Sequence, residues 1–303
     1  MTTTNIPAAH RLRPAGPRKR TAGRWFGDTG WRHVVAIVVS IFAVFPLLFV
    51  LSSSLNPNGT LTGSNVLFSK IGIDSFWRML SGDQGPYLVW FWNTIKIAAV
   101  TAVASTLMGA LAAYAFSRMR FTGRRFGLVT IVVIQMFPQL LGAVAIFLMM
   151  SAIGDVFPPF GLNTHWGLIL VYLGGSLGVN TYLMYGFFNT VPIEIDEAAK
   201  IDGAGHARIF FTIILRLVAP ILAVVALLSV IASVSEYLIA SVLLIDPENQ
   251  TLAVGLVKLV SNPRYADWSA FSAGAIMAAI PVVALFLALQ KYIVGGITAG
   301  AVK

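Results

Sequence analysis

The chain has 303 residues, of which 57% are hydrophobic and only 11% are charged. Because a soluble globular domain carries roughly 25% charged residues, this composition predicts a membrane protein and argues against a soluble fold. The chain has no cysteine, which excludes a disulfide framework and cysteine-based catalysis or metal binding. Its four histidines lack the spacing of a metal site, so we expect no bound metal.

Residues 1–33 form a basic N-terminal tail. They include seven Lys and Arg residues and a single acid, Asp28, among prolines, glycines and small residues. A flexible cytoplasmic tail close to anionic lipid is the preferred interpretation, and nucleic-acid binding is the alternative. The rest of the chain, 34–303, is predicted to be one membrane domain.

Six long apolar segments follow the tail, and they approach or exceed the ~20 residues with which a helix crosses a bilayer. We expect spans at residues 34–51, 87–116, 126–150, 166–188, 213–244 and 271–294. The first contains Pro46, which a helix within a bundle tolerates as a kink. A cleaved signal peptide is the alternative for this segment, but the run exceeds the usual length of a signal's apolar region. The sequence therefore predicts an all-α polytopic membrane protein with six transmembrane helices.

The positions of the basic residues predict the orientation. Sixteen of the 21 Lys and Arg residues fall in the tail, in the loop after the second span, between the fourth and fifth spans and at the C-terminus. Cytoplasmic segments carry such an excess, so both termini are predicted to be cytoplasmic.

A polar island, residues 192–220, interrupts the apolar chain between the fourth and fifth spans. Within seventeen of its residues it carries six charges, at Glu194, Asp196, Glu197, Lys200, Asp202 and Arg208. Pro192 suits the first turn of a helix, and the acids favour the positive end of its dipole. Gly203 and Gly205 can supply the backbone angles that end a helix. We expect a short helix, a sharp turn and a second helix that enters the fifth span.

The side chains of this short helix suit a docking surface. Ala198 and Ala199 are small enough for another protein to approach the backbone closely, while Ile195 and Ile201 offer apolar contact. A solvated loop between two spans is the alternative, which these residues leave open.

The polar island resembles the coupling motif of binding-protein-dependent ABC importer permeases. Glu197-Ala198-Ala199, Gly203, Ile213 and Leu215 match that motif, but Arg216 stands where its final proline is expected. Pro220 follows four residues later, so the departure affects the local bend. The resemblance covers residues 90–303 and includes Asn93–Lys96, Ala113–Phe121, Gln135–Pro138, Gly161–His165, Thr251–Gly255 and Gly296–Gly300. These segments are similar to the smaller permease of maltose/maltodextrin importers.

The resemblance implies a type I ABC importer permease in a bacterial inner membrane. It further implies a second permease subunit, a cytoplasmic ATPase dimer and an extracytoplasmic sugar-binding protein as partners. The residues that it assigns to ATPase coupling are Glu197, Ala198, Ala199, Asp202 and Gly203. ATP and Mg would be bound by the ATPase, because this chain has no Gly-Lys dipeptide and hence no Walker-type phosphate loop. We therefore expect neither a cofactor nor enzymatic activity in this chain.

Two further contacts follow from the resemblance. The loop between the last two spans would reach into the binding protein through Asn249, Gln250, Asn262, Pro263 and Tyr265, although an ordinary connector is the alternative. The final residues, Gly300, Ala301, Val302 and Lys303, resemble a tail that contacts the ATPase interface.

Two charged residues, Lys96 and Glu236, fall inside predicted spans. Such charges are expensive to bury and indicate function by default. Their similar depth suggests a structural ion pair or a gate, and solvated groups lining a cavity are the alternative.

The preferred function is thus the permease subunit of an ATP-driven maltose/maltodextrin importer. The same fold carrying another oligosaccharide, such as trehalose, is the first alternative. An autonomous channel or secondary carrier is the second, but a carrier requires an ionisable network within the membrane, and only Lys96 and Glu236 qualify.

Overall fold

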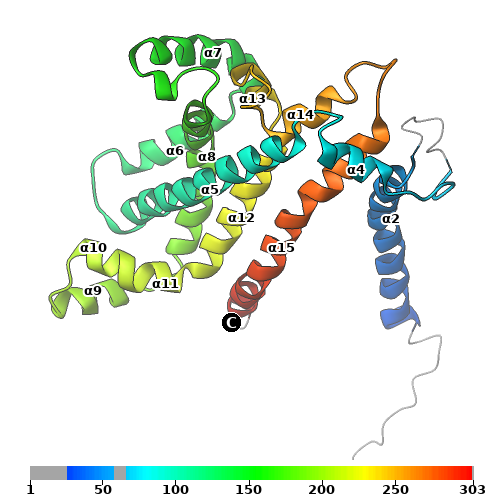
Figure 1. The fold of residues 1–303 in the computed structure, drawn as a ribbon. Coiled ribbons are helices and arrows are strands. Elements are labelled where there is room, and N and C mark those ends of the chain that lie inside the picture. The colour runs from blue at the N-terminus through cyan, green and yellow to red at the C-terminus, as the bar shows by residue number, and fades with distance from the viewer. Residues whose placement is uncertain (1–25, 58–65, 302–303) are drawn as a thin grey trace, which may run out of the picture. The chain divides into compact units, whose positions relative to one another are not determined.

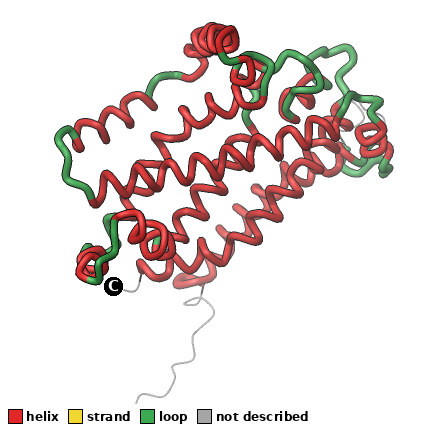
Figure 2. Tube along the Cα trace, turned by 60° about the vertical axis from the view of Figure 1, so that its left-hand side comes forward, coloured by secondary structure: helices red, strands yellow, loops and turns green. Residues whose placement is uncertain are grey.

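The computed structural model describes residues 26–57 and 66–301, and within these ranges every regular element is a helix (Figures 1 and 2). The chain divides into two compact units, residues 1–49 and 50–303. The predicted all-α architecture is confirmed.

The N-terminal unit contains one long helix. A π-helical turn, η1 (Phe26–Gly30), leads into α2 (Trp31–Ser54), whose last residues belong to the second unit. Pro46 lies inside α2 without ending it, and α2 is long and apolar enough to cross a membrane. The first predicted span is therefore a helix, whereas tail residues 1–25 lie outside the described part of the chain.

The second unit holds the remaining elements. After α2 they are α4 (Asp74–Ser81), α5 (Tyr87–Arg118), α6 (Arg124–Gln135), α7 (Gln139–Val156), η2 (Pro158–Phe160) and α8 (His165–Phe188). The polar island forms α9 (Glu194–Ile201), α10 (His206–Arg208), η3 (Ile209–Ile214) and α11 (Leu215–Leu217), and leads into α12 (Ala219–Ser235). The chain then forms α13 (Leu238–Leu243), α14 (Leu252–Lys258) and α15 (Trp268–Ala301).

Helix α5 is central to this unit because it packs along both α8 and α12, and α12 packs in turn against α15. At 1.5 Å per residue its 32 residues span ~48 Å. Its first turns contact the segment that follows α13, and its last residue contacts the segment that precedes α9. The polar island and the segment after α13 thus lie at opposite ends of α5 (Figure 1).

The prediction of one continuous third span at 126–150 was wrong. Helix α6 ends at Gln135, and α7 begins at Gln139 after Pro138. Proline lacks an N–H and disfavours helical angles in the residue before it, which explains a break at this position.

The fifth span, predicted at 213–244, is also divided. The helix before Val218 and α12 meet at an angle of 81°, and α12 ends at Ser235. Glu236 then adopts extended backbone angles, and its carboxylate accepts hydrogen bonds from the N–H groups of Ile239 and Ala240, at 2.8 and 2.9 Å. These bonds satisfy the first donors of α13 and start a new helix.

The other spans agree more closely with expectation. Among the described residues, four helices are long and apolar enough to cross a membrane, and a fifth span results if the bent pair ending in α12 is counted as one. α5 and α8 match the second and fourth predicted spans, whereas α15 continues beyond the predicted end at 294 to Ala301. Helix α4, which lies between the first two predicted spans, is an additional element.

Candidate functional site

Helix α9 presents one face outward and one face inward. Glu194, Glu197, Ala198 and Lys200 are exposed, and Ile201 at its end is 87% exposed. Asp196 and Ala199 are buried on the opposite face. The prediction that both alanines face a partner is therefore corrected: Ala198 lies on the outer face, and Ala199 packs inward.

A glycine ends α9. Gly203 has φ +79°, a left-handed conformation that residues with a Cβ adopt at a cost. Its N–H donates to the Lys200 carbonyl at 3.0 Å, and the N–H of Ala204 donates to the Ala199 carbonyl at 2.9 Å. This pair of bonds is the Schellman motif, which satisfies two carbonyls at the helix end. Asp202, the C-cap residue, is exposed beside it, whereas Gly205 has an ordinary negative φ of −74°.

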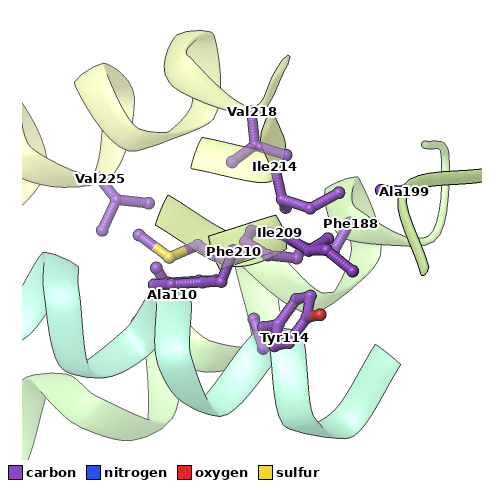
Figure 3. Packing of buried hydrophobic residues seen from close by; sticks show 11 residues of the cluster. Ala110, Tyr114, Phe188, Ala199, Ile209, Phe210, Ile214, Val218 and Val225 are labelled. Atoms are coloured by element: carbon purple, nitrogen blue, oxygen red, sulfur yellow. The ribbon is translucent and has the colours of Figure 1, made fainter. Parts of the chain in front are cut away.

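An apolar cluster packs the inner side of the polar island against the spans (Figure 3). It joins Ala199 of α9 to Tyr114 of α5, Phe188 of α8 and a run from η3 onward that includes Ile209 and Phe210. The rings of Tyr114 and Phe210 have centroids 5.2 Å apart. Burial of this apolar surface fixes the inner face of α9 against the ends of two spans.

The bend that the missing motif proline left uncertain is present. Arg216 is exposed in α11, and the turn falls two residues later at Val218. Pro220 occupies the first turn of α12, where its absent N–H has no intrahelical partner to lose. Pro220 thus lies where a proline can begin the helix that follows the bend.

A buried ion pair, which the sequence analysis did not anticipate, also attaches α9. The Nε of Arg118 lies 2.9 Å from Oδ2 of Asp196, and the two side chains are only 7% and 3% exposed. A second guanidinium nitrogen of Arg118 donates to the Val191 carbonyl at 2.7 Å. The signal was present as an acid inside the predicted helix and an arginine at the end of the second span, but their pairing depends on the tertiary fold.

The predicted ion pair between Lys96 and Glu236 is not formed. Lys96 is exposed on α5, whereas the Glu236 carboxylate caps α13 and accepts a hydrogen bond from the Tyr172 hydroxyl at 2.7 Å. The ion pairs in the described part of the chain include Arg118–Asp196 and Arg78–Asp267. Because the helix is broken after α12, the N–H groups of Ile239 and Ala240 are available to Glu236. In an unbroken span they would bond to backbone carbonyls of the same helix.

A cavity of about 1360 Å³ opens beside the bundle, lined by residues from α6, α7, α8 and α12. Most of its lining is apolar, and its polar groups include Gln135, Asn180 and Glu236. Gln135 donates to the Gly175 carbonyl at 2.8 Å, and Asn180 donates to Ser229 at 3.2 Å. These two amides join neighbouring helices, as such residues commonly do in membrane bundles.

The interspan loop, residues 245–267, separates the predicted binding-protein residues into two groups. Gln250 is only 3% exposed, donates to the carbonyls of Leu244 and Ile245 and accepts from Lys258 at 2.7 Å. Asn249 donates to the Asn163 carbonyl at 3.0 Å. These two residues hold the loop in place, which corrects their assignment to a partner surface. Asn262 and Pro263 are exposed, and Tyr265 is 81% exposed.

Several of the segments that carried the resemblance meet at the base of this loop. Asn93 of α5 donates to the carbonyls of Glu248 and Gln250, and Trp90 donates to that of Pro247 at 2.8 Å. Asn163, with φ +58°, accepts from the N–H groups of Ile245 and Asp246 and donates to the Asp246 carboxylate. The loop is therefore bound to α5 and to the segment before α8 by polar side chains.

The residues predicted to form the C-terminal contact are only partly within the described chain. Gly300 and Ala301 continue α15 as backbone, whereas Val302 and Lys303 lie outside the described residues. The contact stays a prediction.

The apolar bundle, its lateral cavity and the exposed helix between two spans fit the membrane subunit of a transport system. The family of binding-protein-dependent transport system inner membrane components matches residues 105–298. The chain belongs to this family, and it is accordingly a multi-pass inner-membrane permease.

Individual relatives match over nearly the full chain. The maltodextrin transport system permease protein MdxG of Bacillus subtilis is 41% identical, covering 89% of this chain and 95% of the relative. The galactooligosaccharides permease protein GanQ of the same organism and the maltose/maltodextrin permease protein MalG of Escherichia coli are each 38% identical, covering 89% of this chain and 94% of the relative.

A solved structure shares the fold. A chain of a bacterial ABC transporter that imports the acidic polysaccharide alginate aligns with a TM-score of 0.72 and 26% identity, over 91% of this chain and 99% of that one. The protein therefore has the type I ABC importer permease fold.

Proposed function

We propose that this chain is one of two permease subunits of an ATP-driven importer of maltose or maltodextrins. A cytoplasmic ATPase dimer supplies the energy, and an extracytoplasmic binding protein delivers the sugar. ATP and Mg are bound by the ATPase, and this chain contributes one half of the pathway.

The observation that carries this proposal is the exposed outer face of α9. Glu197, Ala198 and Gly203 match the family's coupling motif. They and Asp202 are all accessible, while the opposite face is anchored in the bundle. A partner that bound tightly to this face would move the ends of α5 and α8 together with α9. Rigid-body switching between two orientations requires such a firm attachment.

The sugar class rests on the relatives. Two of the three relatives described above carry maltose or maltodextrin in their names, which supports the preferred substrate. The similarity to GanQ makes galactooligosaccharides a second candidate.

Uptake of labelled maltotriose by a strain that lacks this chain tests the substrate. We expect uptake to return when the chain is supplied and to be inhibited by unlabelled maltodextrins. Stronger inhibition by galactooligosaccharides or trehalose would reassign the sugar, and uptake that does not depend on this chain would refute the proposal.

The C-terminal residues Gly300 to Lys303 form a second contact with the ATPase in this proposal. Their deletion should lower the sugar uptake obtained per ATP hydrolysed while leaving the subunit in the membrane. An unchanged ratio would remove this contact from the proposal.

A further inference from the structure

The Arg118–Asp196 pair is the feature of the polar island that the family motif leaves unexplained. It joins the last residue of α5, which spans the bundle, to the buried face of α9. Arg118 also holds the Val191 carbonyl in the link between α8 and α9. One guanidinium therefore connects a membrane span, the approach to α9 and α9 itself.

The energetics of the pair argue against a purely stabilising role. Removing two charges from water costs about as much as their attraction returns, so apolar residues of similar size commonly replace a buried pair without loss of stability. Neither carboxylate oxygen of Asp196 has an aligned hydrogen-bond donor among the described residues, although Arg118 Nε lies at 2.9 Å. The attraction between two charges depends on their separation and not on the angle of an N–H bond. The contact therefore tolerates small changes of angle without releasing α9.

The apolar contacts of α9 restrict its orientation less than the ion pair does. Ala199 is its buried member of the apolar cluster, and a single methyl group provides a small contact area. Asp196 lies three residues earlier, on the same face of the helix. Two contacts on one face of a helix, one apolar and one ionic, fix its rotation as well as its position.

We propose that Arg118 and Asp196 are positioning residues that transmit the movement of α9 to α5. The inference rests on the proposed function, in which an ATPase moves α9. Loss of the pair would leave the outer face of α9 intact and able to bind the ATPase, but α9 would turn without carrying α5.

The first test uses the assembled importer in proteoliposomes and measures sugar uptake per ATP hydrolysed. Asp196→Asn should lower this ratio by about 5- to 150-fold, the usual range of coupling between sites, with ATPase binding retained. The double variant Arg118→Met/Asp196→Leu should recover the thermal stability of the original complex but not its ratio. Recovery of both properties would show that the pair only supports the fold, and a normal ratio in Asp196→Asn would also overturn the inference.

Arg78→Met provides the matched control. It removes the other described ion pair, Arg78–Asp267, which is less buried and joins α4 to the start of α15. The ratio should be unchanged in this variant. An equal loss of coupling would mean that any broken ion pair has this effect, and the special role of Arg118 would be refuted.

A second measurement needs no ATPase and separates this inference from the proposed function. Because the chain has no cysteine, spin labels can be attached at Ala198→Cys on α9 and Leu111→Cys on α5, both exposed positions. The distance distribution should be narrow in the otherwise unchanged protein and broader with Asp196→Asn. An unchanged distribution refutes the positioning role. Failure of the permease without substitutions to bind an ATPase refutes the proposed function alone.

Discussion

At one end of α5, helix α9 is attached by a single face, through Asp196 and Ala199, while its opposite face is open. At the other end, Trp90 and Asn93 of α5 donate hydrogen bonds to the interspan loop, and Asn163 before α8 accepts one from the N–H of Ile245. A substitution in the outer face of α9 therefore has few intramolecular contacts to break. Substitutions at the base of the interspan loop should instead cost stability.

The largest effect is expected from Gly203→Pro. Proline fixes φ near −65° and has no N–H, so it fits neither the φ of +79° nor the bond to the Lys200 carbonyl. The end of α9 should unravel, and sugar uptake should fall to background while the subunit remains in the membrane. Gly205→Ala is the control, since its φ is negative and a Cβ there meets no atom within 4 Å. Normal uptake by Gly203→Pro would contradict the docking role of α9.

Glu197→Lys should abolish transport with little change in stability. Glu197 is exposed, and a surface substitution changes the free energy of unfolding by only about 0.5 kcal/mol or less. Reversal of its charge should instead prevent ATPase docking, measured as loss of co-purification. Asp155→Lys makes the same change at an exposed site at the end of α7 and should co-purify normally. Retained docking in Glu197→Lys would assign the ATPase contact elsewhere.

The features that the sequence predicted well are those set by residues close together in the chain. Apolar length and the positions of basic residues predicted α2, α5 and α8 closely, because span length depends on membrane thickness. The acids and glycines of the polar island predicted α9 and its end, because caps act within a few residues of sequence.

Features that depend on distant residues were not predictable in this way. The partner of Asp196 lies at the end of α5, so the sequence around α9 could not show that this side chain is buried. Pro138 was visible in the sequence, but a proline can kink a membrane helix or end it, depending on its neighbours. The break at Glu236 rests on local bonds, but the sequence could not show whether this carboxylate caps a new helix or forms an ion pair.

Gln250→Ala should destabilise the protein. It leaves Lys258 and two backbone carbonyls without their buried partner, at a cost of about 1–3 kcal/mol. A lower melting temperature of the purified subunit would confirm this role. Asn262→Ala, at an exposed position of the same loop, should leave the melting temperature unchanged but weaken binding-protein contact. Equal melting temperatures for the two variants would contradict the division of the loop.

The last comparison pairs two glycine substitutions, and the smallest expected effect is that of the second, Gly186→Ala. A Cβ at Gly255 of α14 would overlap the Trp90 ring, which must then shift and weaken its bond to the Pro247 carbonyl. Overpacking of this kind costs about 1–3 kcal/mol, so Gly255→Ala should lower the melting temperature. Gly186→Ala in α8 adds the same methyl group where no atom lies within 4 Å, and it should gain about 0.5–1 kcal/mol from its helix preference. If both variants melted alike, the close packing of α14 on α5 would not contribute to holding the interspan loop.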